Sequence, residues 1–209
     1  MTDDIPYPRF ASRGHAYVYV LPCRDEDLLK VGFSREPFRR FHTLHRRFFE
    51  FFDLDRGLLI AVDRLADARR IERQFITTWA DNRAPAPLVV PLSAAGHTEW
   101  YRGIHAEVTA CAREIAARDN HSLHEPLRPW LRHQLQVRAD LLFDWSTRML
   151  ELVEYEQFNC PPGEEGRPYR QALLDTLDMY AGIGLPLADL LPAAVLDWYG
   201  HGDHRTIFG

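Results

Sequence analysis

Two short segments near the beginning of the chain decide its fold. They read HAYVYVL at residues 15–21 and LLKVGF at residues 28–33. Both are rich in β-branched and aromatic residues, which is typical of strands, and a polar stretch separates them. We therefore predict a β-hairpin. Because side chains alternate along a strand, Tyr17 and Tyr19 share one face of the first strand, and Lys30 and Gly32 share one face of the second.

The segment after the hairpin predicts a helix. Ser34 is a good N-cap, and Glu36 and Pro37 suit the first turn. Apolar residues then recur at helical spacing and form a stripe. They are Phe38, Phe41, Leu44 and Phe48.

A third strand and a second helix follow. Residues 57–63 read GLLIAVD, an apolar run of strand length, and residues 65–79 show helical periodicity. Glu72 lies inside the apolar stripe of this second helix. Burial of a carboxylate is costly unless it is paired or bound to metal, so Glu72 is a candidate metal ligand, with a buried Glu–Arg pair as the alternative. Glu99 and Trp100 predict a short segment that closes the sheet.

These elements predict an α+β fold with a small three-stranded antiparallel sheet flanked by helices, over residues 1–105. From residue 104 onward the pattern is helical, so residues 106–209 are expected to form an all-helical second domain. A long helix is predicted at residues 130–155, and two more at 169–181 and 187–199. Their apolar positions suit packing against one another, and a homodimer seam or a surface for a protein partner is the alternative.

The composition indicates an ordinary soluble protein. Of 209 residues, 46% are hydrophobic and 26% charged, and the apolar runs are too short to span a membrane. The first residues lack the apolar core of a secretory signal. Cys23, Cys111 and Cys160 are too widely spaced for a disulfide framework or a zinc motif. We therefore expect a cytoplasmic protein that does not bind membranes.

The charge is distributed unevenly. The net charge is −5, but residues 1–105 carry a net +2 and residues 106–209 a net −7. An acidic chain is unsuited to coating nucleic acid, whereas a local basic patch can still bind phosphate. Such a patch lies in the first predicted helix, although a solvated helix face is the alternative. It consists of Arg35, Arg39, Arg40, Arg46 and Arg47.

Lys30 is the only lysine in the chain, since the other 24 of the 25 Lys+Arg residues are arginines. Coding bias explains such a composition in general. The lysine that remains points to a position where a compact ammonium is needed and a guanidinium is not equivalent.

The order of these motifs resembles the GIY-YIG nuclease superfamily. Residues 17–19, YVY, correspond to its G-I-Y motif, and residues 30–32, KVG, correspond to Y-I-G. The second motif is similar to a phage and bacterial branch that carries K-I-G. Residues 98–101, TEWY, resemble the closing T-E-W-F segment of that branch. The resemblance covers residues 15–103.

The resemblance implies a metal-dependent nuclease that cleaves phosphodiester bonds of nucleic acid, with DNA as the expected substrate and RNA as the alternative. Its catalytic residues would be Tyr19, Lys30, Arg40 and Glu72, with Arg39 as the alternative to Arg40. Glu72 would hold one divalent cation, Mg²⁺ or Mn²⁺. Arg40 would bind phosphate, and Lys30 would supply a point charge or lower the pKa of Tyr19, the general base. Residues expected to bind nucleic acid are Arg35, Arg39, Arg46 and Arg47.

The chain departs from the general family pattern at three places, one of which is Lys30 in the position of the second tyrosine. Tyr17 stands where the first motif has glycine, and Ile76 stands where relatives often carry a histidine four residues after the glutamate. Tyr17, His42 and His45 are therefore candidates for catalytic support. The departures leave two alternatives: a catalytically silent module that binds nucleic acid or a protein, and a toxin-like effector nuclease whose helical half binds a carrier.

Overall fold

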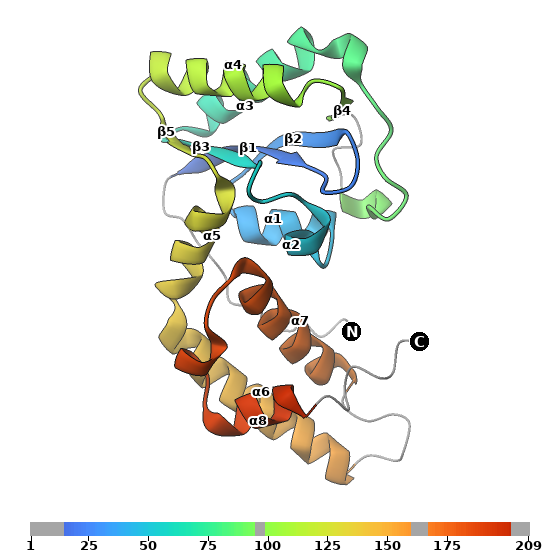
Figure 1. Cartoon of the computed structure of the whole chain (residues 1–209), viewed down its shortest axis with the longest axis vertical. Helices are drawn as coiled ribbons and strands as arrows, with labels where there is room; N and C mark the ends of the chain where they lie inside the picture. The colour runs from blue at the N-terminus through green and yellow to red at the C-terminus, as the bar shows by residue number, and fades with distance from the viewer. Residues whose placement is uncertain (1–14, 95–98, 160–166, 202–209) are drawn as a thin grey trace. The chain divides into compact units, whose positions relative to one another are not determined.

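The computed structural model describes residues 15–94, 99–159 and 167–201 (Figure 1). The described residues up to Trp130 form one compact unit, and those from Leu131 onward form a second. The first unit therefore runs past residue 105, where we expected the first domain to end. Residues 105–124 belong to it because they contribute a helix and a strand that pack on and pair with the sheet.

The first unit is built on an antiparallel sheet in the order β4-β2-β1-β3-β5. The strands are β1 (Ala16–Pro22), β2 (Leu28–Ser34), β3 (Leu58–Val62), β4 (Trp100–Arg102) and β5 (Ser122–His124). The predicted α+β class is confirmed, but the sheet has five strands where we expected three. The two outer strands have three residues each, too few to show an alternating pattern.

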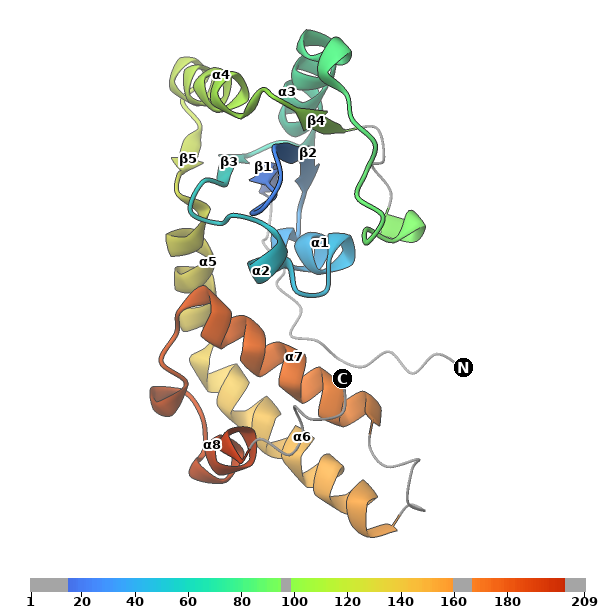
Figure 2. The ribbon, with the colours of Figure 1, turned by 45° about the vertical axis from the view of Figure 1, so that its right-hand side comes forward.

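Helices cover both faces of this sheet (Figures 1 and 2). One face carries α3 (Leu65–Thr78) and α4 (His105–Arg118). There Val18 and Ile60 pack with Ile71 of α3 in a single buried core. The other face carries α1 (Pro37–Leu44) and α2 (Phe48–Phe51). Because strand side chains alternate, Tyr19, Lys30 and Gly32 lie on this second face.

The second unit is helical, as predicted for the C-terminal half. Its elements are α6 (Ala139–Asn159), α7 (Arg167–Ile183) and α8 (Ala193–Gly200), preceded by α5 (Leu127–Gln136), which begins in the first unit. The helix expected at residues 130–155 is thus interrupted between Gln136 and Ala139. Short 3₁₀ turns lie at Ala80–Asn82, Leu92–Ala94 and Leu187–Asp189. Within the described ranges, no helix has the length and apolar character needed to cross a membrane.

Candidate active site

Tyr19 and Gly32 form the centre of the candidate site. They are direct partners in the β1–β2 register, and Tyr19 is fully buried. A Cβ built on Gly32 would lie 2.5 Å from the phenolic oxygen of Tyr19 and 2.7 Å from the adjoining ring carbon. Such a contact is not possible, so the tyrosine ring lies across the backbone of β2 only because residue 32 is glycine.

Arg40 of α1 reaches this phenol. Its Nε donates a hydrogen bond of 3.0 Å to the Tyr19 oxygen, and its Nη1 donates to the carbonyl oxygen of Ala94. Burial raises the pKa of Tyr19 to about 12, although the Arg40 guanidinium acts in the opposite direction. Tyr19 is therefore a protonated phenol at neutral pH, and its oxygen accepts a hydrogen bond from the positively charged Arg40. The lowering effect that we expected from Lys30 comes from Arg40.

Lys30 is an ammonium group inside the protein, with 1% of its side chain exposed. Its Nζ donates to the carbonyl oxygen of Val31 at 2.6 Å and to Oε2 of Glu99 at 3.0 Å. Burial lowers the pKa of Lys30 to about 8, and the Glu99 carboxylate limits the decrease. The only lysine of the chain is thus a buried, paired cation that titrates close to neutral pH.

Glu72 contributes the second carboxylate. It follows the buried Ile71 on α3 and so lies about 100° further round the helix, half-buried at the border of the core. Burial raises the pKa of Glu72, and the negative charge of Glu99 raises it further. The cations Lys30 and Arg40 act in the opposite direction. The Glu72 carboxylate is therefore in the same electrostatic environment as Lys30 and Arg40.

The structure places the four expected catalytic residues in one electrostatic environment, since each of Tyr19, Lys30 and Glu72 has its pKa shifted by Arg40, although α3, which carries Glu72, covers the opposite face of the sheet from Tyr19 and Lys30. It adds Glu99, to which we had assigned a structural role in closing the sheet. Glu99 does adjoin β4, and its carbonyl oxygen accepts the Val31 N–H at 3.0 Å. The TEWY motif indicated that Glu99 matters, but sequence spacing could not show that it pairs with Lys30.

The two carboxylates suit one hard divalent cation. The negative charge of Glu99 raises the pKa of Glu72, and a cation placed near both carboxylates would offset this repulsion. In the described ranges, no group of three or more His, Cys, Asp or Glu side chains is arranged to hold a metal. A site with one or two carboxylates, completed by water and phosphate oxygens, is the coordination that Mg²⁺ favours.

The three residues proposed for catalytic support are positioned differently. The Tyr17 ring packs on Trp130, with centroids 5.4 Å apart. His45 stacks on Phe51 at 4.5 Å, and its Nδ1 accepts the backbone N–H of Arg47. His42 is half-buried on α1, two residues after Arg40 and thus about 200° away round the helix. Neither histidine is among the main groups that shift the pKa of the central residues.

The basic patch of α1 is partly neutralised within the protein. Arg39 lies 3.7 Å from Glu36, and Arg47 forms two hydrogen bonds to Glu50 at 2.6 and 2.7 Å. Arg47 also lies 5.1 Å above the ring of Phe49. Arg35 and Arg46 are exposed. Exposed pairs of this kind are weak and can exchange partners, so binding of nucleic acid by this patch stays a prediction.

Comparison with known families finds one match, which lies within the first unit. Residues 14–116 match the T5orf172 domain, a phage-associated domain with a GIY-YIG-like, nuclease-type fold. The matched range includes Tyr19, Lys30, Arg40, Glu72 and Glu99. No curated protein and no solved structure matches the chain. The match agrees with a nuclease-like or nucleic-acid-binding module, while the K-I-G branch stays a prediction.

Proposed function

We propose that the T5orf172 domain of this chain is a metal-dependent nuclease that hydrolyses phosphodiester bonds of nucleic acid, DNA in preference to RNA. One observation carries the proposal: Arg40 donates to the buried Tyr19 oxygen at 3.0 Å, in a site that also contains the charges of Lys30 and Glu72. A tyrosine that only packs in the core needs no charged hydrogen-bond donor. A tyrosine that must become a phenolate is stabilised by one.

Phosphodiester hydrolysis requires neutralisation of the negative charge that develops on the phosphate. Arg40, whose Nε contacts Tyr19 and whose Nη1 contacts the Ala94 carbonyl, adds a guanidinium charge that attracts the phosphate. Lys30 supplies a second positive charge from a buried position, where Coulomb interactions are stronger than in water. A divalent cation at Glu72 would add positive charge at the phosphate and at the attacking water.

Tyr19 can take a proton from that water only as a phenolate, so its pKa must fall and its own proton must first pass to bulk solvent. Burial is the main reason for the high pKa, and the carboxylates of Glu72 and Glu99 raise it further. Neutralising Glu72 would therefore lower the pKa of Tyr19, and Arg40 would stabilise the phenolate through the existing hydrogen bond. The general-base role of Tyr19 thus depends on the charge at Glu72.

One observation favours a second function, a silent module that binds nucleic acid without cleaving it. Two of the three N–H donors of the Lys30 ammonium are already bound to groups of the protein itself, the Val31 carbonyl and Glu99. A supercoiled-plasmid nicking assay separates the two functions. The nuclease predicts nicked product that depends on Mg²⁺ or Mn²⁺ and is abolished by EDTA. The silent module predicts retention of the plasmid in a gel shift and no nicked product with either metal.

A further inference from the structure

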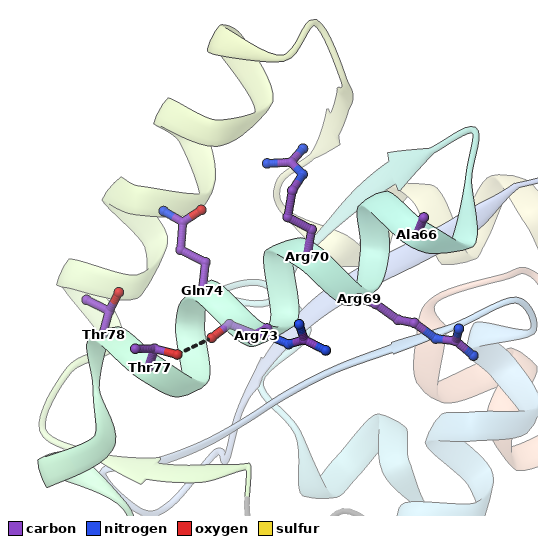
Figure 3. Close-up of a pocket in the computed structure, with 7 residues that line it drawn as sticks. All are labelled: Ala66, Arg69, Arg70, Arg73, Gln74, Thr77 and Thr78. Atoms are coloured by element: carbon purple, nitrogen blue, oxygen red, sulfur yellow. Dashed lines mark hydrogen bonds between the residues drawn. The ribbon is translucent and has the colours of Figure 1, made fainter.

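The outer surface of α3 carries a shallow groove of about 660 Å³ that none of the expected site residues lines (Figure 3). Six of its seven lining residues have basic or polar side chains. The lining residues are Ala66, Arg69, Arg70, Arg73, Gln74, Thr77 and Thr78.

The spacing of these residues forms straight rows. Arg69, Arg73 and Thr77 are four residues apart and so lie on one line along α3. All three are exposed. Figure 3 shows Arg69 and Arg73 leaving the helix on one side and Arg70 on the other. Four residues correspond to about 6 Å of rise. Two guanidinium groups at this separation are suited to a linear polyanion.

The arginines of the groove differ in their partners. Arg70 forms ion pairs with Asp119 at 2.9 Å and with Asp67 at 3.7 Å, so carboxylates of the protein itself balance its charge. Among the described parts of the chain, no carboxylate lies within ion-pair distance of Arg69 or Arg73. Two exposed cations are thus left without a paired acid, on a chain whose net charge is −5. Such a charge pattern favours an anionic partner.

The groove adjoins the candidate active site. Glu72 lies between Arg69 and Arg73 in sequence, and the Arg69 charge lowers the pKa of the Glu72 carboxyl group. An anion bound along this row would therefore approach the position of the proposed chemistry. The basic patch of α1, by contrast, is partly paired with Glu36 and Glu50.

We propose that the α3 groove binds the phosphodiester backbone of the nucleic-acid substrate, with Arg69 and Arg73 contacting two phosphates of one strand; the proposal rests on the proposed nuclease function. Strand charges recur about every 3.4 Å along duplex DNA. The two arginines are about 6 Å apart along the axis of α3, and their long side chains can reach separate phosphates of one strand. The hydroxyl groups of Thr77 and Thr78 extend the row with further donors.

The test is the salt dependence of binding, measured by fluorescence anisotropy with a labelled 30-base-pair DNA duplex. The full chain carries Glu72→Gln and EDTA is present, so cleavage does not affect the result. Adding Arg69→Gln and Arg73→Gln should lower the slope of log K against log salt by about 1.8, since each phosphate contributes about 0.9. Affinity at 0.1 M salt should fall on the order of 50-fold.

Two controls make the result specific. Arg132→Gln with Arg148→Gln removes the same charge from exposed positions outside the first unit and should leave the slope unchanged. Arg69→Lys with Arg73→Lys keeps the charge and should retain most of the slope, provided that thermal melting shows folded protein. Duplex RNA of the same length tests whether the groove distinguishes the two backbones, and poly-glutamate tests a protein ligand.

An unchanged slope in the Gln pair, an equal loss in the Arg132/Arg148 control, or tighter binding of poly-glutamate than of DNA would overturn the proposal. The outcome is separable from that for the nuclease. Plasmid cleavage by the wild type, without an effect of the Arg69→Gln and Arg73→Gln pair on DNA binding, would support the nuclease function and contradict DNA binding in this groove. The predicted change in slope, without any plasmid cleavage by the wild type, would support DNA binding in this groove and contradict the nuclease function.

Discussion

Gly32 faces Tyr19 across β1 and β2, so closely that a Cβ at residue 32 would lie 2.5 Å from the phenolic oxygen. The glycine thus holds open the space in which the Tyr19 ring meets Arg40. Packing of the Tyr19 ring therefore requires glycine at the end of the KVG motif. Through Tyr19, this glycine also supports the proposed chemistry.

Gly32→Ala should destabilise the protein and impair the site. The added methyl group forces Tyr19 from its position, and overpacking of this kind costs about 1–3 kcal/mol. Urea unfolding measures the loss. The matched control is Gly200→Ala, because nothing lies within 4 Å of a Cβ built there. Equal stability of Gly32→Ala and wild type would show that the Tyr19 ring is not held as described.

Lys30 should titrate with a pKa of about 8, well below the ordinary value. Because Lys30 is the only lysine, a chain labelled with ¹³C at the lysine ε position gives one side-chain NMR signal to follow with pH. Glu99→Gln removes a charge that raises this pKa, so the midpoint should move to lower pH. The variant should also lose about 1.5–3 kcal/mol, the contribution of a hydrogen bond to a charged group. An unchanged midpoint in Glu99→Gln would contradict the pairing.

Tyr19→Phe should remove cleavage and preserve the fold. The substitution deletes only the oxygen that accepts from Arg40, a loss of about 1 kcal/mol. If Tyr19 is the general base, the rate should fall by about 10²–10⁴-fold, with DNA affinity nearly unchanged. A loss of affinity that equals the loss of rate would instead assign Tyr19 to binding.

Glu72→Gln should stabilise the metal-free protein at neutral pH. Burial raises the pKa of Glu72, so its ionisation is less favourable in the folded than in the unfolded chain. The native state then binds more protons above the ordinary carboxyl pKa of about 4.3, and wild-type stability falls as pH rises through this range. The difference between variant and wild type should therefore vanish below about pH 4 and grow toward pH 7. Thermal melting in EDTA measures it. A Glu72→Gln protein less stable than wild type at pH 7 would support a structural Glu–Arg pair.

The central elements of the first unit could be predicted from sequence because their patterns are local. The strands expected at residues 15–21 and 28–33 are observed at Ala16–Pro22 and Leu28–Ser34, and the helix expected at residues 65–79 spans Leu65–Thr78. Alternation predicted that Tyr17 and Tyr19 share a face of one strand and Lys30 and Gly32 a face of the next, and the register of β1 and β2 puts Tyr19, Lys30 and Gly32 on the same face of the sheet. The helix expected after Ser34 begins at Pro37 but stops at Leu44, and Phe48 belongs to a separate short helix.

What sequence could not supply depends on contacts between distant segments. The pair of Lys30 with Glu99 joins residues 69 positions apart, and the edge strand at Ser122–His124 acquires its structure by pairing with β3. The same holds for the exclusion of a Cβ at Gly32, which only the cross-strand register reveals. Arg69 and Arg73 belong to no sequence motif, and only the structure shows that the neighbouring Arg70 is paired with Asp119 and Asp67.

The most direct measurement for the central claim is plasmid nicking by the wild type and by Glu72→Gln, over a range of Mg²⁺ and Mn²⁺ concentrations. A neutral amide is a poor ligand for a hard dication, so the variant should lose both cleavage and metal dependence while it stays folded and binds DNA at least as tightly. Glu99→Asp serves as a control that keeps the second carboxylate. Wild-type nicking that requires metal and disappears in Glu72→Gln is the predicted result. Undiminished nicking by Glu72→Gln, or no nicking by the wild type with either metal, would contradict the account.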